Sequence, residues 1–169
     1  MVYLRATKKV LKFLPLTSGE SADSDTALGD WYVNRVVIGK SPLLLMVSSK
    51  SLLPIVVPAR NVKTLGKRLP QIVGDRLERL EVDRAIIEAE INVMDSVQVG
   101  STTSRSVLGT MVDFAKSMPF YIARVGLEEP GLQYAEDRLA HTPCRCRQSA
   151  GAVIWPDRTA VELLTEKWQ

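Results

Sequence analysis

A run of hydroxyl side chains comes before an amphipathic stretch in the second half of the chain, and it could bind an anion. The run GSTTSRS (100–106) contains Thr103, Ser104, Arg105 and Ser106. The first amides of a helix lack partners within the helix and carry partial positive charge, so they can hold a phosphate or a carboxylate. No glycine-rich loop with a Lys-Ser/Thr pair accompanies the run. The simpler alternative is that Thr103 or Ser104 only caps a helix.

The segment HTPCRC (141–146) contains the only histidine and both cysteines of the chain. His141, Cys144 and Cys146 are possible zinc ligands, but a structural zinc site needs a fourth ligand, which a carboxylate such as Asp137 would have to supply. The spacing also differs from the Cys-x-x-Cys pair of zinc deaminases. We therefore predict no bound metal and no cofactor. Two cysteines exclude a disulfide framework and favour a reducing compartment.

The segment LGDWYVN places Asp30 and Asn34 on either side of Trp31 and Tyr32. An aromatic pair beside polar groups can form a binding surface. Aromatic residues are also typical of strands, where they pack into the core, and we favour that alternative. The sequence does not indicate a catalytic triad. His141 is the only histidine, and no third group is evident that would orient a Cys–His pair.

The first hundred residues contain most of the segments that are typical of strands, and short turns separate three of them. We predict an α+β fold in which an antiparallel sheet of about four to five strands, mostly from the N-terminal half, packs against several helices. Two prolines, Pro54 and Pro58, favour an edge position or a strand end for the segment that contains them. The expected strands are 2–6, 30–39, 43–47, 52–58 and 96–99.

Apolar residues recur at helical spacing in most of the remaining chain. Pro70 lies inside one such pattern and predicts two helices or one kinked helix there, and Asp83 is a plausible cap for the next helix. The residues Pro15–Gly29 are rich in Ser, Asp and Gly and predict a mobile loop, and 142–151 predict another loop. The expected helices are 8–14, 62–80, 84–91, 105–123, 130–140 and 156–167.

Length and composition are those of an ordinary globular domain, so we predict that residues 1–169 form a single one. Hydrophobic residues make up 46% of the chain and charged residues 24%, close to globular averages. No apolar run is long enough to span a membrane, and the basic N-terminal segment lacks a cleavage site, so we expect a cytoplasmic protein. The net charge of +3 is too small to indicate nucleic-acid binding by itself.

Several phrases of the chain, taken together, resemble an uncharacterised bacterial family of single-domain proteins. The phrases are LGDWYVN (28–34), SLLPIVVPAR (51–60), SRSVLGTMVDF (104–114) and HTPC (141–144). The family pattern has Ser and Asn where this chain has Thr110 and Val112, so a function of that Asn would not transfer. The resemblance implies a bacterial cytoplasmic protein and brings no activity, substrate or cofactor. It also includes Cys144 alone, which makes the Cys144–Cys146 pair incidental and argues further against zinc.

Two function classes remain. The leading hypothesis is a non-catalytic binding module that uses the polar side of the helix at Arg105 and the nearby Trp31 region to bind a protein or an anionic ligand. The alternative is an enzyme or a nucleic-acid-processing protein, in which Asp30 and Asp113 share a cleft with Arg105. Nucleic-acid binding without chemistry ranks last unless the positive charges prove to be clustered. The sequence does not indicate an oligomeric state.

Overall fold

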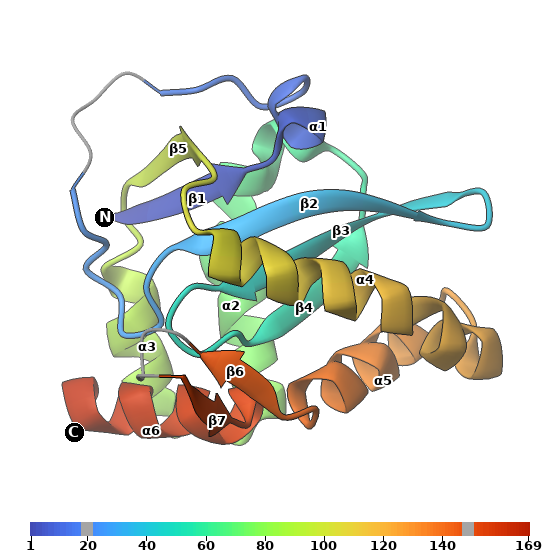
Figure 1. Ribbon diagram of the computed structural model, residues 1–169. Coiled ribbons are helices and arrows are strands. Elements are labelled where there is room, and N and C mark those ends of the chain that lie inside the picture. Colours follow the sequence, from blue (N-terminus) through green and yellow to red (C-terminus); the bar gives the residue numbers. More distant parts are fainter. Residues whose placement is uncertain (18–21, 147–150) are drawn as a thin grey trace.

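The computed structural model describes residues 1–17, 22–146 and 151–169. Its centre is a five-stranded sheet with helices on both faces (Figure 1). The strand order across the sheet is β4-β3-β2-β1-β5, which confirms the α+β class. The strands are β1 (Val2–Ala6), β2 (Trp31–Ile38), β3 (Ser41–Ser48), β4 (Pro54–Pro58) and β5 (Val97–Ser101).

The sheet is mixed, so the prediction of a purely antiparallel sheet was wrong. Strands β2, β3 and β4 form an antiparallel meander, as expected from their short turns. The first strand, β1, runs parallel to both β2 and β5. Parallel neighbours need a long crossover connection, and two connections provide it: residues 7–30 lead from β1 to β2, and 59–96 lead from β4 to β5. Strand β4 lies at the edge, as its two prolines predicted.

Helices fill most of the chain between and after the strands. Pro70 lies inside the single helix α2, which follows a short 3₁₀ turn, and Asp83 caps α3 by accepting a hydrogen bond from the Ala85 amide. The segment expected to be only a loop contains a strand, because Cys144–Cys146 pairs with Ala152–Ile154. The helices are α1 (Lys8–Leu11), η1 (Val62–Thr64), α2 (Leu65–Arg79), α3 (Arg84–Asn92), α4 (Arg105–Val125), α5 (Glu129–Ala140) and α6 (Pro156–Trp168), and the hairpin strands are β6 (Cys144–Cys146) and β7 (Ala152–Ile154).

Buried side chains on the two faces of the sheet form two separate clusters. Successive side chains of a strand point to opposite faces, so Leu44 packs on the side of α2 while Leu45 packs on the side of α4. The apolar arc predicted for α4 is confirmed, and its buried members are Val107, Met111, Phe114, Met118 and Ile122. Of the described helices, none is long and apolar enough to cross a membrane.

The described parts of Pro15–Gly29 are tied to the rest of the fold. The Thr17 amide donates to the carbonyl of Val99, 3.1 Å away, and the Thr17 hydroxyl accepts from the Val99 amide at 2.9 Å. Further along, the completely buried carboxylate of Glu90 accepts hydrogen bonds from two successive backbone amides, those of Ala27 and Leu28. Residues 18–21 lie outside the described chain, and the mobility of the segment stays a prediction.

Candidate functional site

The hydroxyl-rich run before α4 is held by contacts within the protein. Ser104 caps the helix, because its hydroxyl accepts a hydrogen bond from the Val107 amide at 3.2 Å. Its own amide donates to the Tyr32 hydroxyl, which also shares a hydrogen bond with Thr103. Arg105 follows on the surface, exposed to solvent. The capping alternative therefore describes Ser104, and anion binding by this helix start stays a prediction.

The polar residues around Trp31 are used within the fold. Asp30 accepts from Arg5 Nε at 2.9 Å and from the Ser24 hydroxyl at 2.6 Å, and Asn34 accepts from the Thr7 hydroxyl at 2.8 Å. Trp31 is 0% exposed, so a partner cannot contact it without unfolding the core. The packing alternative, which the sequence favoured, describes Trp31, and partner binding by Asp30 and Asn34 stays a prediction.

Two of the polar segments singled out in the sequence meet across a pocket of about 410 Å³ beside α4, which we call the α4 groove. Ser106 and Asp113 line it from α4, and Cys144 lines it from the β6 hairpin. Arg105 and Asp30 do not line it, and Asp30 pairs with Arg5 instead. The predicted meeting of Arg105, Asp30 and Asp113 is therefore not among the described contacts.

Two of the three candidate metal ligands have other partners, and the side chain of the third, Cys146, lies outside the described part of the chain. His141 Nδ1 pairs with the carboxylate of Asp157, and the Cys144 thiol donates to the carbonyl of Thr142 at 3.3 Å. Within the described ranges, no group of three His, Cys, Asp or Glu side chains is arranged to hold a metal ion.

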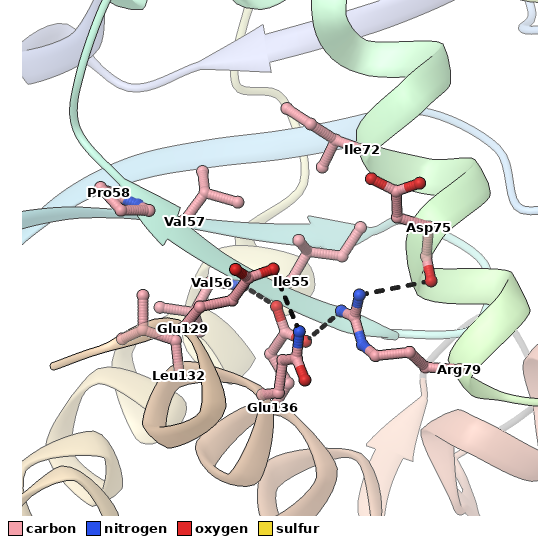
Figure 2. A pocket seen from close by; sticks show the side chains of 11 residues that line it. Ile55, Val56, Val57, Pro58, Ile72, Asp75, Arg79, Glu129, Leu132 and Glu136 are labelled. Carbon is pink, nitrogen blue, oxygen red and sulfur yellow. Dashed lines mark hydrogen bonds and ion pairs between the residues drawn. The ribbon is translucent and has the colours of Figure 1, made fainter. Parts of the chain in front are cut away.

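A second pocket lies against the edge strand β4 and was missed by the sequence reasoning. This edge pocket has a volume of about 230 Å³ between β4, α2 and α5. Figure 2 shows Glu136 of α5 and Arg79 of α2 reaching toward each other beside the β4 strand. Glu136 Oε2 lies 2.6 Å from Arg79 Nη2, and Oε1 accepts from the Val56 amide at 2.8 Å. Both carboxylate oxygens of this 2% exposed residue are thus engaged.

Burial raises the pKa of Glu136 above its usual value, although Arg76, the Val56 amide and Arg79 act in the opposite direction. Arg76 is completely buried beneath it and pairs with Asp137 at 2.8 Å. A carboxyl group with a shifted pKa in a pocket is a common mark of an active site. Glu136 also has a structural role, because its carboxylate accepts the hydrogen bond of a backbone amide at the edge of the sheet.

A signal for Glu136 was present in the sequence. It stands four residues after Leu132 and three before Leu139, within the buried stripe of α5. A charged residue inside an apolar helical stripe needs a partner in the fold.

Positive charge is strongly segregated along the chain, another feature that we missed. Residues 1–17 and 31–74 contain eleven Lys or Arg and no Asp or Glu, whereas the rest of the chain contains eleven and nineteen. The described carboxylates form no ion pair with ten of these eleven basic side chains, and eight of the ten lie outside the two turns that contain Lys40 and Lys50. We call the eight the basic face: Lys8, Lys9, Lys12, Arg35, Arg60, Lys63, Lys67 and Arg68.

The fold brings separate parts of the basic face together. In Figure 1, α1 lies beside the connection that leads from β4 to α2. Arg68 of α2 donates hydrogen bonds to the carbonyls of Arg60 and Asn61, in place of any carboxylate. A pocket of about 470 Å³, the basic groove, is lined from three elements by Phe13, Arg35, Asn61, Val62, Lys63 and Thr64, among others.

Fold and site define a class: an α+β domain with a mixed sheet, an internally bonded helix start and one carboxylate-poor basic face. Within this class, the chain belongs to the family described as Domain of unknown function (DUF6933), whose model matches residues 3–159. This confirms the resemblance to an uncharacterised family. The comparisons found no matching curated protein and no matching solved structure.

Proposed function

We propose that this protein is a non-catalytic binding module whose partner is anionic and engages the basic face. The observation that supports the proposal is the segregation of charge, with eleven basic and no acidic residues in two chain segments. A surface whose cations lack carboxylate neighbours attracts anions and raises their local concentration. The small net charge of the chain conceals this surface, because acidic residues elsewhere offset it.

The earlier hypothesis placed binding at the helix start near Arg105, and the two locations can be compared directly. Arg105 and Lys116 are exposed on α4, which covers one face of the sheet. Lys63 and Lys67 are exposed at η1 and α2, which covers the opposite face. Reversing two charges at either place changes the net charge equally. Any difference in binding between the two variants therefore shows which surface binds the anion.

The test measures binding of a fluorescent polyanion, heparin, to three proteins at low salt. We expect Lys63→Glu, Lys67→Glu to weaken binding at least tenfold and Arg105→Glu, Lys116→Glu to weaken it less than threefold. Circular dichroism checks that all three are folded. An equal loss in both variants would show that net charge alone determines binding. A loss confined to the α4 variant would move the binding surface to the helix start.

A further inference from the structure

An aromatic ring lies among the cations of the basic groove. Phe13 is 46% exposed, although the backbone around it is fixed. Its amide and that of Leu14 both donate to the carbonyl of Val10, and the side chains of Val10 and Leu14 are buried in the core. The ring therefore lines the groove from a firm support instead of moving with a free terminus.

Cations lie around this ring from other elements. Arg35 of β2 and Lys63 of η1 line the same groove as Phe13. Lys63 also lines a neighbouring pocket of about 520 Å³ together with Lys67. Lys63 thus joins the two pockets into a track that begins at the aromatic ring and passes Lys63 to reach Lys67. One carboxylate, Asp95, lines the far pocket. None of the described Asp or Glu side chains lines the part that contains Phe13.

We infer that the anionic partner is a single-stranded nucleic acid, which lies along this track with one base stacked on Phe13. The inference rests on the proposed function and names its partner. Proteins that bind single strands combine a positive groove for the backbone with aromatic rings on which bases stack. Arg35, Lys63 and Lys67 supply the positive groove, and Phe13 supplies the ring.

A stacking ring distinguishes a single strand from other polyanions. In a duplex the faces of the bases are already stacked on each other, so the ring of Phe13 has no free base to cover. An acidic protein offers charge but no flat partner for the ring. An anionic lipid surface is the main competitor, because Leu16 near Phe13 is also exposed. However, α1 has only four residues and is too short to lie on a membrane as an amphipathic helix.

The salt dependence gives a number to test. Four phosphate contacts, by Arg35, Lys63, Lys67 and one further side chain of the basic face, would give a slope of log affinity against log salt of about −2.8 for a single strand. Affinity would then fall about 50-fold between 50 and 200 mM salt. Replacing Lys63 and Lys67 by Gln would reduce that fall to about sevenfold, because two of the four contacts are lost.

The experiment measures fluorescence anisotropy of labelled twelve-nucleotide RNA and DNA of mixed sequence, as single strands and as duplexes. Phe13→Ala should weaken single-strand binding by about 5- to 150-fold, and Phe13→Tyr should restore it. Phe120→Ala is the matched control, because Phe120 is 75% exposed on α4 on the opposite side of the sheet. Polyglutamate and vesicles of phosphatidylserine with phosphatidylcholine are tested beside the oligonucleotides.

The outcomes separate this inference from the proposed function. Single strands bound more tightly than duplexes, with a loss in Phe13→Ala alone, would support the inference. Equal binding of single strands and duplexes, or no effect of Phe13→Ala, would overturn the inference. A loss of binding in the Lys63 and Lys67 variant would then still support an anionic partner. Vesicle binding that depends on Phe13, without oligonucleotide binding, would overturn the inference and show that the partner is an anionic membrane surface. Failure to bind any of the polyanions at 50 mM salt would overturn both.

Discussion

Removing the buried carboxylate of Glu136 should loosen the edge of the sheet, and two substitutions separate its charge from its hydrogen bonds. Glu136→Ala leaves the Val56 amide without its acceptor and leaves Arg76, which is 0% exposed, with one fewer counter-charge. Breaking a buried ion pair by removing one partner costs about 3–5 kcal/mol. We expect Glu136→Ala to lower the free energy of unfolding by an amount in this range.

Glu136→Gln should cost much less, about 1 kcal/mol, the net value of one hydrogen bond. The amide oxygen of Gln can still accept from Val56, and Arg79, whose side chain is 29% exposed, can turn to water. The raised pKa of Glu136 agrees with this expectation, because burial makes the charged form less favourable in the folded protein than in the unfolded chain.

Urea unfolding at pH 7, followed by tryptophan fluorescence, measures both changes. Glu162→Ala is the control, because Glu162 is an exposed residue of α6 whose loss should change stability by less than about 0.5 kcal/mol. A cost below about 1 kcal/mol for Glu136→Ala would refute a role in holding the edge. Equal costs for Ala and Gln would show that the charge of the carboxylate, and not its hydrogen bond to the strand, provides the stabilisation.

Three further predictions concern pH, a helix cap and a tight corner. Because the pKa of Glu136 is raised in the folded protein, the part of its contribution that depends on the protonated form is full below the unfolded value of 4.5 and is lost as pH rises through the folded pKa, whereas its hydrogen bond with Val56 remains. The stability difference between wild type and Glu136→Gln should therefore shrink with rising pH in urea titrations, by at most about 1.4 kcal/mol per pH unit. Ser104→Ala removes the acceptor of the Val107 amide and should cost about 1 kcal/mol in the same assay, with Ser104→Asp retaining the cap. Gly131→Ala would place a methyl group 2.1 Å from the carbonyl oxygen of Gly126, so we expect the α4–α5 corner to shift and the melting temperature to fall by several degrees, and an unchanged melting temperature would contradict this close contact.

Local signals in the sequence were sufficient for most elements. The helix from Arg105 was predicted because its apolar residues recur at helical spacing, and the structure buries them as expected. The edge position of β4 followed from Pro54 and Pro58, since proline cannot donate to a ladder. The Asp83 cap followed from the same kind of local rule. Each of these features depends on residues that are near one another in the chain.

The direction of β1 could not be predicted in this way. Its parallel pairing with β2 and β5 depends on how residues 7–30 and 59–96 cross the sheet, and no short segment encodes that path. The surroundings of Asp30 and Trp31 could not be predicted for a related reason. Trp31 and Asp30 are polar or aromatic residues at a strand start, and only the folded chain shows that one is buried and the other pairs with Arg5.

The net charge of the chain gave a poor guide to its surface, because it does not show how the basic and acidic residues are distributed. The absence of Asp and Glu from 31–74 was visible in the sequence, yet the net charge of +3 concealed it. The sequence does not show which of these residues meet in space, and the structure places Phe13 in one groove with Arg35 and Lys63. Two basic side chains from separate parts of the chain, Arg35 and Lys63, thus share one groove, and this arrangement is why we propose a nucleic-acid partner above the rank that net charge gave it.

The two edges of the sheet limit how a partner can bind. On β4, Pro54 and Pro58 lack amide hydrogens, and the outward amide of Val56 is already bonded to Glu136. On β5, Thr17 bonds both the amide and the carbonyl of Val99. Added strands need free backbone donors and acceptors at an edge. Because these positions are occupied, we expect a partner to engage side chains, and the basic face offers eight basic side chains that form no ion pair with a described carboxylate.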